Sequence, residues 1–167
     1  AVAFRARVGT NTGIGSEALV ADGTEEQKRK YLPLMASGET TGCLALTEPD
    51  AGSEASNIGT AAPRKGGHYV LNGMKRYITN APIADLFTVF VRTDNASQGT
   101  RGVTAFIVER GFEGLSTSAP YTMMGQAGSP VGEVYFNDCI VPARNVVGET
   151  EGVGFKTAMK LLNKQRI

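Results

Sequence analysis

Histidine and cysteine, two side chains that often carry metal or nucleophilic chemistry, are scarce in this sequence. Its 167 residues include one histidine, His68, and two cysteines, Cys43 and Cys139. A lone histidine supplies neither a histidine pair for a metal nor a Ser-His-Asp set, so we expect no metal site and no such hydrolase. Both cysteines lie in apolar, strand-like runs. This favours buried thiols in a reducing compartment, with a disulfide between them as the lesser alternative.

Excess charge and long hydrophobic runs are also missing. The 17 basic and 16 acidic residues leave a net charge of +1, which is too small to indicate nucleic acid, and the aromatic side chains mostly lie in apolar runs. No apolar run approaches the ~20 residues that span a bilayer, and no basic flank with an apolar core marks a targeting segment. We therefore expect a soluble domain with neither a nucleic-acid nor a membrane partner.

The clearest helical signal covers residues 25–37. Thr24 is a suitable N-cap, and Gln27, three residues later, completes a capping box. Gly38 follows as a C-terminal stop. Pro33 lies inside this segment and is expected to kink or split the helix.

Short apolar or alternating runs dominate the middle of the chain, from residue 41 to about residue 147, with turn-forming residues between them. The strands expected from these runs cover residues 43–46, 57–62, 69–72, 76–79, 86–92, 103–109, 115–117 and 133–136. Residues 1–21 and 152–167 have helical patterns. The sequence therefore predicts a mainly β fold, an antiparallel β-barrel or sandwich, flanked by partial helical segments.

Two stretches carry the strongest functional signal. Residues 42–54 read GCLALTEPDAGSE, a short buried strand stopped by Pro49 and followed by small, turn-forming residues that can present backbone N–H groups to a ligand. Residues 72–81 read NGMKRYITNA, an Asn-Gly turn followed by a strand whose alternation places Tyr77 and Thr79 on one face. Taken alone, these two side chains are better explained as an ordinary strand pair on one face, and only the motif context favours a functional role.

Together with EVYFNDCIVPARNVVGETEGVGF at residues 133–155, these stretches resemble, in order and spacing, the middle domain of the acyl-CoA dehydrogenase family of flavoenzymes. The resemblance covers residues 22–167. It implies the end of an N-terminal helical domain at 1–40, a β-barrel domain that binds flavin and acyl thioester at 41–149, and the truncated start of a C-terminal helical domain at 150–167.

The resemblance implies FAD as the cofactor. A flavin needs donors at N5 and at the N1–O2 edge, because the hydride that it receives leaves negative charge there. By resemblance, Thr47 with Leu46 before it would meet the pyrimidine edge. Thr79, which follows Ile78 in the motif, would reach N5, and Tyr77 would cover the ring on the side away from the substrate. Family members often have tryptophan at the position of Tyr77.

The loop after residues 42–47 would serve the cofactor's phosphates and the substrate. By resemblance, Gly52 and Ser53 approach the pyrophosphate, and Ser53 also approaches the thioester arm of the substrate. We expect Glu48 to form a structural ion pair with Lys75 or Arg76 rather than to act as a catalytic acid. The glutamate that removes the substrate α-proton would come from the C-terminal helical domain, so no catalytic residue is expected in this chain.

The resemblance implies a flavin-dependent oxidation of an acyl thioester to a trans-2-enoyl thioester, with a flavoprotein as electron acceptor and a homo-oligomer, a tetramer or dimer, as the full-length form. The alternative is a module that binds flavin or acyl thioester without redox turnover. Residues 124–130, MGQAGSP, depart from the commonest family form, which has arginine at the position of Ala127. The carrier, coenzyme A or an acyl carrier protein, therefore stays open. The location would be a bacterial-type cytoplasm, or the mitochondrial matrix if a transit peptide was removed.

Overall fold

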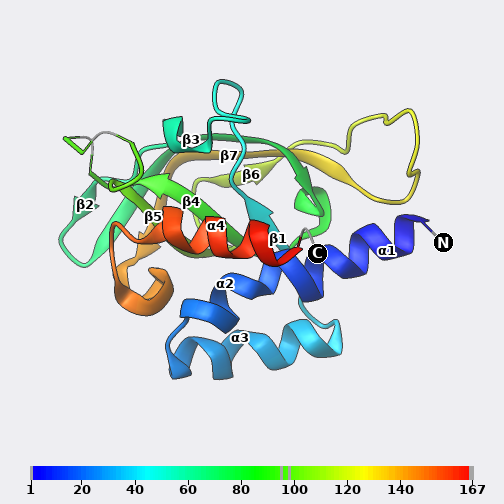
Figure 1. The fold of residues 1–167 in the computed structure, drawn as a ribbon, viewed down its shortest axis with the longest axis horizontal. Coiled ribbons are helices and arrows are strands. Elements are labelled where there is room, and N and C mark those ends of the chain that lie inside the picture. Colours follow the sequence, from blue (N-terminus) through cyan, green and yellow to red (C-terminus); the bar gives the residue numbers. More distant parts are fainter. Residues whose placement is uncertain (1, 95, 98, 166–167) are drawn as a thin grey trace.

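The chain folds into a helical layer packed on two stacked β-sheets (Figure 1). The computed structural model describes residues 2–94, 96–97 and 99–165; the last two residues of the predicted segment 150–167 lie outside these ranges. One sheet has the order β1-β4-β5 and the other β2-β3-β7-β6. The strands are β1 (Gly42–Ala45), β2 (Arg64–Lys65), β3 (His68–Thr79), β4 (Leu86–Arg92), β5 (Val103–Glu109), β6 (Leu115–Thr117) and β7 (Val131–Pro142).

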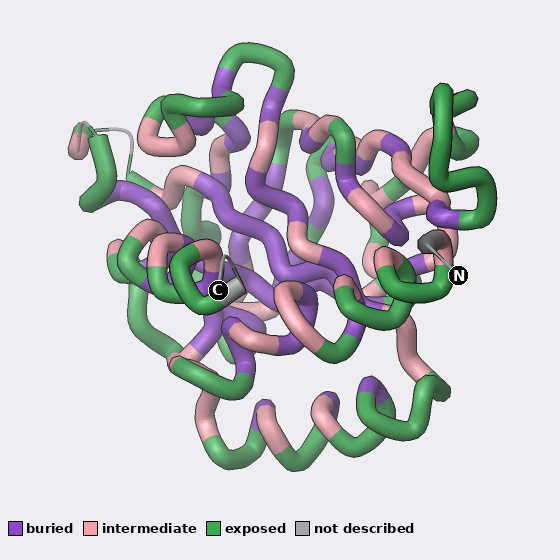
Figure 2. The backbone as a smooth tube through the Cα atoms, turned by 45° about the vertical axis from the view of Figure 1, so that its right-hand side comes forward, coloured by how far each residue is buried: buried purple, intermediate pink, exposed green. Residues whose placement is uncertain are grey.

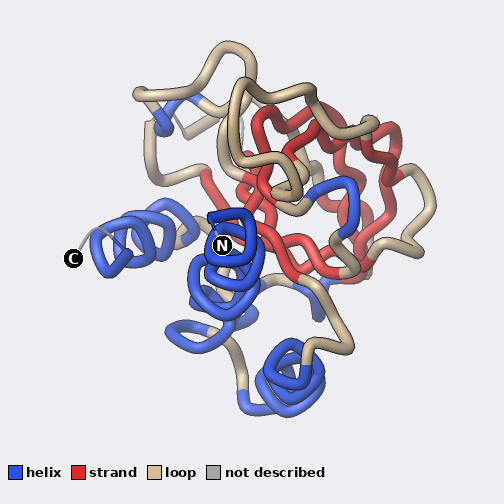
Figure 3. Tube along the Cα trace, turned by 90° about the vertical axis from the view of Figure 1, so that its right-hand side faces the viewer, coloured by secondary structure: helices blue, strands red, loops and turns tan. Residues whose placement is uncertain are grey.

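The helices gather on one side of the strands (Figure 3). The α-helices are α1 (Val2–Gly9), α2 (Gly15–Asp22), α3 (Glu25–Ser37) and α4 (Gly154–Gln165), and a π-helical turn, η1 (Thr10–Ile14), joins α1 to α2. Short 3-10 turns cover Ala55–Asn57, Ala81–Ile83, Ala143–Asn145 and Val147–Glu149. Among the described residues, no helix combines the length and the apolar character needed to cross a membrane.

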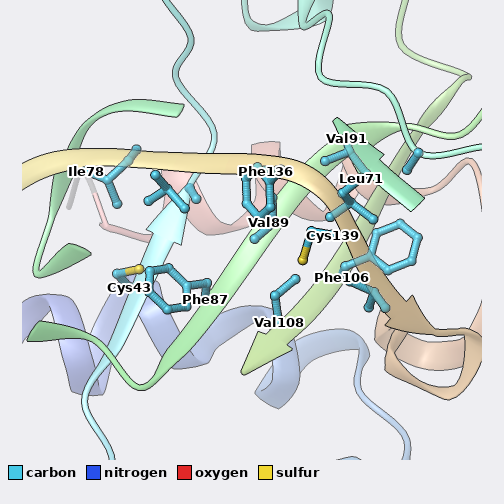
Figure 4. Packing of buried hydrophobic residues seen from close by; sticks show 14 of the residues in the cluster. Cys43, Leu71, Ile78, Phe87, Val89, Val91, Phe106, Val108, Phe136 and Cys139 are labelled. Carbon is cyan, nitrogen blue, oxygen red and sulfur yellow. The ribbon is translucent and has the colours of Figure 1, made fainter. Parts of the chain in front are cut away.

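Two hydrophobic clusters lie on opposite faces of the three-stranded sheet. Between the two sheets, side chains such as Phe87 and Phe106 meet Leu71 and Phe136 from the four-stranded sheet (Figure 4). On the other face, the helices α2, α3 and α4 cover the sheet. Strands β4 and β5 are therefore buried along almost their whole length (Figure 2). Burial on both faces explains why their sequences are continuous apolar runs without alternation.

The predicted mainly β fold with flanking helices is confirmed, and it takes the sandwich form. In the described part of the chain the strands form two separate sheets rather than a closed barrel. One pairing departs from the antiparallel pattern: β1 runs parallel to β4, with Gly42 opposite Leu86. A parallel pair needs a long connection, and here the whole of β2 and β3 lies between the two strands.

The predicted helix over residues 25–37 is confirmed with its capping box. The Thr24 side chain accepts from the backbone of Gln27, the Gln27 side chain accepts from the Thr24 backbone, and Gly38 ends the helix in a left-handed conformation. Of the two effects expected from Pro33, a split of the helix was wrong, because one helix runs from Glu25 to Ser37; a kink stays a prediction. Tyr31 and Met35 are buried on either side of Pro33, and this packing offsets the lost backbone hydrogen bond.

The Asn72-Gly73 turn was predicted wrongly. The two expected strands of residues 69–72 and 76–79 are one continuous strand, β3, which pairs with β7 on both sides of a register shift at Gly73. Gly73 has a φ of 144°, and a Cβ there would lie 2.9 Å from the Cα of Thr60. Glycine is therefore required by a bulge and by a close chain crossing, not by a hairpin.

Residues 57–62 also differ from the prediction. Instead of a strand, this segment continues from a 3-10 turn and forms single β-bridges at Ala61, to Asn72 and to Arg92. This segment therefore touches β3 on one side and the end of β4 on the other, each through a single bridge. The helical predictions for residues 1–21 and 152–167 are confirmed over the described residues.

Candidate functional site

A pocket of about 390 Å³ lies where the C-terminal ends of β1 and β3 meet the helical layer. All seven residues predicted to contact the cofactor line it: Leu46, Thr47, Gly52, Ser53, Tyr77, Ile78 and Thr79. They come from two segments that are more than 20 residues apart in the sequence, and the fold brings them to one place. Their individual roles toward a ligand stay predictions.

Backbone hydrogen bonds shape the first wall of the pocket, the loop that follows β1. The Arg76 N–H donates to the Thr47 carbonyl at 2.8 Å, which ties the loop to β3. Glu48 and Ala51 exchange two backbone bonds and close a tight turn around Pro49. Beyond this turn Gly52 is exposed, and a Cβ there would meet no protein atom within 4 Å. The loop of small residues that was predicted to present backbone N–H groups to a ligand therefore faces free space beside the pocket.

The second wall is the end of β3, where strict alternation fails. The register shifts between Lys75 and Ile78, and Tyr77 has a positive φ of 57°. Tyr77 is 61% exposed, its ring lies 5.6 Å from that of Tyr121, and the Arg76 guanidinium lies 5.1 Å from its centre. Tyr77 and Thr79 do share the pocket, as predicted, but across an irregular strand rather than through simple alternation.

Ile78 contributes to the pocket in a different way. It is 3% exposed and packs in the cluster between the sheets, where Figure 4 shows its side chain. A ligand would therefore meet mainly its backbone.

Half of the lining comes from residues that were not predicted to contact the cofactor. They are Thr10 and Ile14 of the π-helical segment, Leu44 of β1, Ala55, and Met159, Leu162 and Asn163 of α4. The helical pattern of residues 152–167 was recognised in the sequence, but the contact of this helix with the motif residues depends on how α4 packs against α2 and β5. The N-terminal helices, the β-sheets and the last helix thus all contribute walls.

A second pocket of about 600 Å³ adjoins the first. Thr10, Tyr77 and Thr79 line both pockets, and the second one extends to the loop that contains Met124 and Gln126. This loop is the one in which the sequence departs from the commonest family form. Met124 is fully exposed there.

Behind the first wall lies a buried ion pair. The Lys75 Nζ is 2.7 Å from Glu48 Oε1, and the Lys75 side chain is fully buried. The predicted structural role of Glu48 is confirmed, with Lys75 as its partner; Arg76 instead lies 3.4 Å from Glu133.

Burial and charge act in opposite directions on this pair. Burial lowers the pKa of Lys75 to about 8, although the Glu48 carboxylate opposes the shift. Burial also raises the pKa of Glu48, but the Lys75 ammonium, together with hydrogen bonds from Thr60 and Gly59, outweighs it and holds that pKa below its usual value. Near neutral pH both groups are therefore charged, and Glu48 is engaged away from the pocket.

The chemistry of the pocket suits a flat, partly polar ring. The Thr47, Ser53 and Thr79 hydroxyls offer hydrogen-bond donors, while side chains such as Leu46 and Met159 offer apolar surface. No carboxylate belongs to this lining in the part of the chain that the structure describes. The residues present fit a flavin, and they supply no general base.

Comparisons with known proteins identify the family of this chain. The family "Acyl-CoA dehydrogenase, middle domain" matches residues 43–139, and "Acyl-CoA dehydrogenase, N-terminal domain" matches residues 1–39. The mitochondrial isovaleryl-CoA dehydrogenase of Pongo abelii is 44% identical over 160 residues, which are 95% of this chain and 38% of that protein. The chain therefore spans less than two fifths of this relative.

Solved structures show the same fold. An acyl-CoA dehydrogenase from Bacillus anthracis complexed with FAD is 42% identical, with a TM-score of 0.91 over 98% of this chain and 28% of that one. A glutaryl-coenzyme A dehydrogenase in complex with glutaryl-CoA is 35% identical, with a TM-score of 0.93 over 99% of this chain and 42% of that one. From its sequence, its fold and the family regions that it matches, this chain belongs to the acyl-CoA dehydrogenase family.

Proposed function

We propose that this chain is the part of an FAD-dependent acyl-CoA dehydrogenase that binds the flavin and the acyl thioester, in an enzyme that oxidises the thioester to its trans-2-enoyl form. The observation that carries the proposal is the meeting of seven motif residues in one pocket. The Bacillus anthracis relative complexed with FAD and the relative complexed with glutaryl-CoA support both ligands.

Different residues of the pocket would contact different parts of the flavin. Leu46 and Thr47 would meet its pyrimidine edge, Thr79 would donate toward N5, and Tyr77 would cover one face, with the Ile78 backbone beside it. When bound, FAD supplies the acceptor for the β-hydrogen of the substrate. Donors held by a rigid sheet need no reorganisation when charge develops on the ring, which is the main way such donors accelerate a reaction.

Gly52 and Ser53 would serve the phosphates and the thioester arm. Both residues are exposed beside the pocket, and the open space at Gly52 lets a phosphate approach the backbone. The Ser53 hydroxyl would contact the substrate as well as the cofactor.

The α-proton of the substrate needs a carboxylate base within hydrogen-bond reach. The described lining contains none, and Glu48 is held by Lys75. We therefore place the base in a part of the whole enzyme outside this chain. If no such base is present, the same pocket would act as a binding module for flavin or acyl thioester without turnover.

The partners follow from the same proposal. The carrier would be coenzyme A, as in the glutaryl-CoA complex, with an acyl carrier protein as the alternative. The acceptor would be an electron-transferring flavoprotein, and the whole enzyme would be a homo-oligomer. The two free, buried cysteines suit a reducing compartment, either a bacterial cytoplasm or the mitochondrial matrix.

Thr79→Val tests the proposal in the whole enzyme, since valine keeps the shape of threonine and removes its donor. Flavin reduction by substrate, followed by stopped-flow absorbance, should slow by roughly 10- to 1,000-fold, the cost of one lost transition-state donor. Thr117→Val, a strand threonine that is absent from the pocket lining, is the matched control and should leave the rate unchanged. A purified whole protein without flavin absorbance that does not take up added FAD would refute the proposed function.

A further inference from the structure

The Lys75 ammonium makes three contacts inside the protein. It donates to Glu48 Oε1, to the Leu46 carbonyl at 3.2 Å and to the Phe90 carbonyl. An ammonium group has three protons, so every donor of Lys75 has an acceptor although the side chain is fully buried. Such complete satisfaction gives the group one defined position.

Glu48 is held with similar completeness. Its carboxylate accepts from the Gly59 N–H at 2.7 Å, from the Thr60 N–H at 3.0 Å and from the Thr60 hydroxyl at 2.5 Å. The ion pair is therefore anchored to a separate chain segment and does not depend on the pocket for its geometry.

The position of Lys75 bears directly on one wall of the pocket. Lys75 holds the Leu46 carbonyl through its side chain, and the next residue, Arg76, holds the next carbonyl, that of Thr47, through its backbone N–H. Two successive residues of β3 thus fix two successive peptide groups at the end of β1. Leu46 and Thr47 both line the pocket, beyond the last paired residue of β1.

A trans peptide carries its C=O and its N–H on opposite sides. Fixing the Leu46 carbonyl toward buried Lys75 therefore directs the Thr47 N–H to the other side of that peptide. We propose that Lys75 is a positioning residue for the cofactor: through the Leu46 carbonyl it orients the Leu46–Thr47 peptide at the flavin's pyrimidine edge. The proposal rests on the function proposed above.

The test compares two substitutions within the same ion pair in the whole protein. Lys75→Met removes the bond to Leu46 and keeps the length of the side chain. Glu48→Gln also breaks the ion pair, and because the carboxylate that raises the pKa of Lys75 is gone, it favours the neutral amine. That amine still has two N–H donors for the Leu46 and Phe90 carbonyls. Removing one member of a buried ion pair destabilises the fold in either case. If Lys75 had a purely structural role, the two substitutions should therefore change the affinity for FAD by similar amounts.

The Kd for FAD, titrated into the apoprotein by flavin fluorescence, is the main readout. We expect Lys75→Met to raise this Kd about tenfold, equivalent to ~1.4 kcal/mol, and Glu48→Gln to change it by less than about twofold. The visible spectrum of the bound flavin should shift in Lys75→Met alone, because its polar edge loses an oriented donor. Urea unfolding of each apoprotein measures the accompanying loss of stability.

If Lys75→Met does not fold, the double variant Glu48→Gln with Lys75→Met replaces it. This variant buries no unpaired charge, so it should fold, and it still lacks the bond to Leu46. Wild-type affinity in the folded Lys75 variant, or an equal loss in Glu48→Gln, would overturn the inference while the proposed function stands. A wild-type protein that does not bind FAD would overturn both.

Discussion

Asn11 joins three parts of the structure, and its removal should measure how strongly the helical layer is coupled to the β-sheets. Its side-chain amide donates to the Met35 carbonyl at 3.1 Å, near the end of α3. Its side-chain oxygen accepts from the Gly42 N–H at 2.7 Å, where β1 begins. Asn11 is itself buried within the π-helical turn, next to Thr10 of the pocket.

The substitution Asn11→Ala leaves these two groups in different situations. The buried Gly42 N–H loses its partner, which costs about 1–3 kcal/mol. The Met35 carbonyl keeps a second bond from the Gly38 N–H at 3.3 Å, so the loss of its bond from Asn11 should cost only about 0.5–1.5 kcal/mol. We expect a total loss of about 1.5–4.5 kcal/mol in the free energy of unfolding.

Urea unfolding of chain 1–167, followed by circular dichroism, provides the measurement. Thr12→Ala is the control, because its exposed hydroxyl bonds only to the Val8 carbonyl within the same helical segment, and its effect should stay within about 0.5 kcal/mol. If Asn11→Ala also changed the stability by less than about 0.5 kcal/mol, these contacts would not couple the helices to the sheets. A separate early transition of the helices in the wild-type chain would refute the coupling as well.

Three further outcomes are expected. The pKa of Glu48 in the folded protein lies below its usual value of 4.5, so its contribution to stability should be present above pH 4.5 and should be lost as the pH falls through the folded-state pKa. Urea unfolding at several pH values measures this, and Glu48→Gln should abolish the pH dependence of stability that Glu48 causes. Gly73→Ala should cost about 2–4 kcal/mol of unfolding free energy through its positive φ and its contact with Thr60, whereas Gly67→Ala, with open space around it, should cost far less. Chain 1–167 loaded with FAD should not reduce an electron-accepting dye with acyl-CoA substrates, and turnover above free flavin that vanished in Glu48→Gln would place the base within this chain.

Part of this structure follows from interactions between near neighbours in the sequence. The helix of residues 25–37 could be predicted with its ends because Thr24, Gln27 and Gly38 act on backbone groups at most three residues away. The strands β4 and β5 could be predicted because burial on both faces demands unbroken apolar runs. The seven pocket residues could be named from the resemblance to a family, and the structure brings them together.

Contacts between distant segments decided the rest. Asn72-Gly73 has the composition of a turn, but pairing with β7 more than 60 residues later makes it a bulge within one strand. In the sequence, Lys75 and Arg76 were equal candidates for the ion-pair partner of Glu48. Only the fold distinguishes them, because it buries Lys75 beside Glu48 and leaves Arg76 partly exposed beside Glu133. No motif predicts that Thr10 and Met159 line the pocket, because these residues reach it through the packing of whole helices. A local pattern records the backbone preferences of a few residues, whereas these features depend on the free energy of burying surfaces that meet only after the chain has folded.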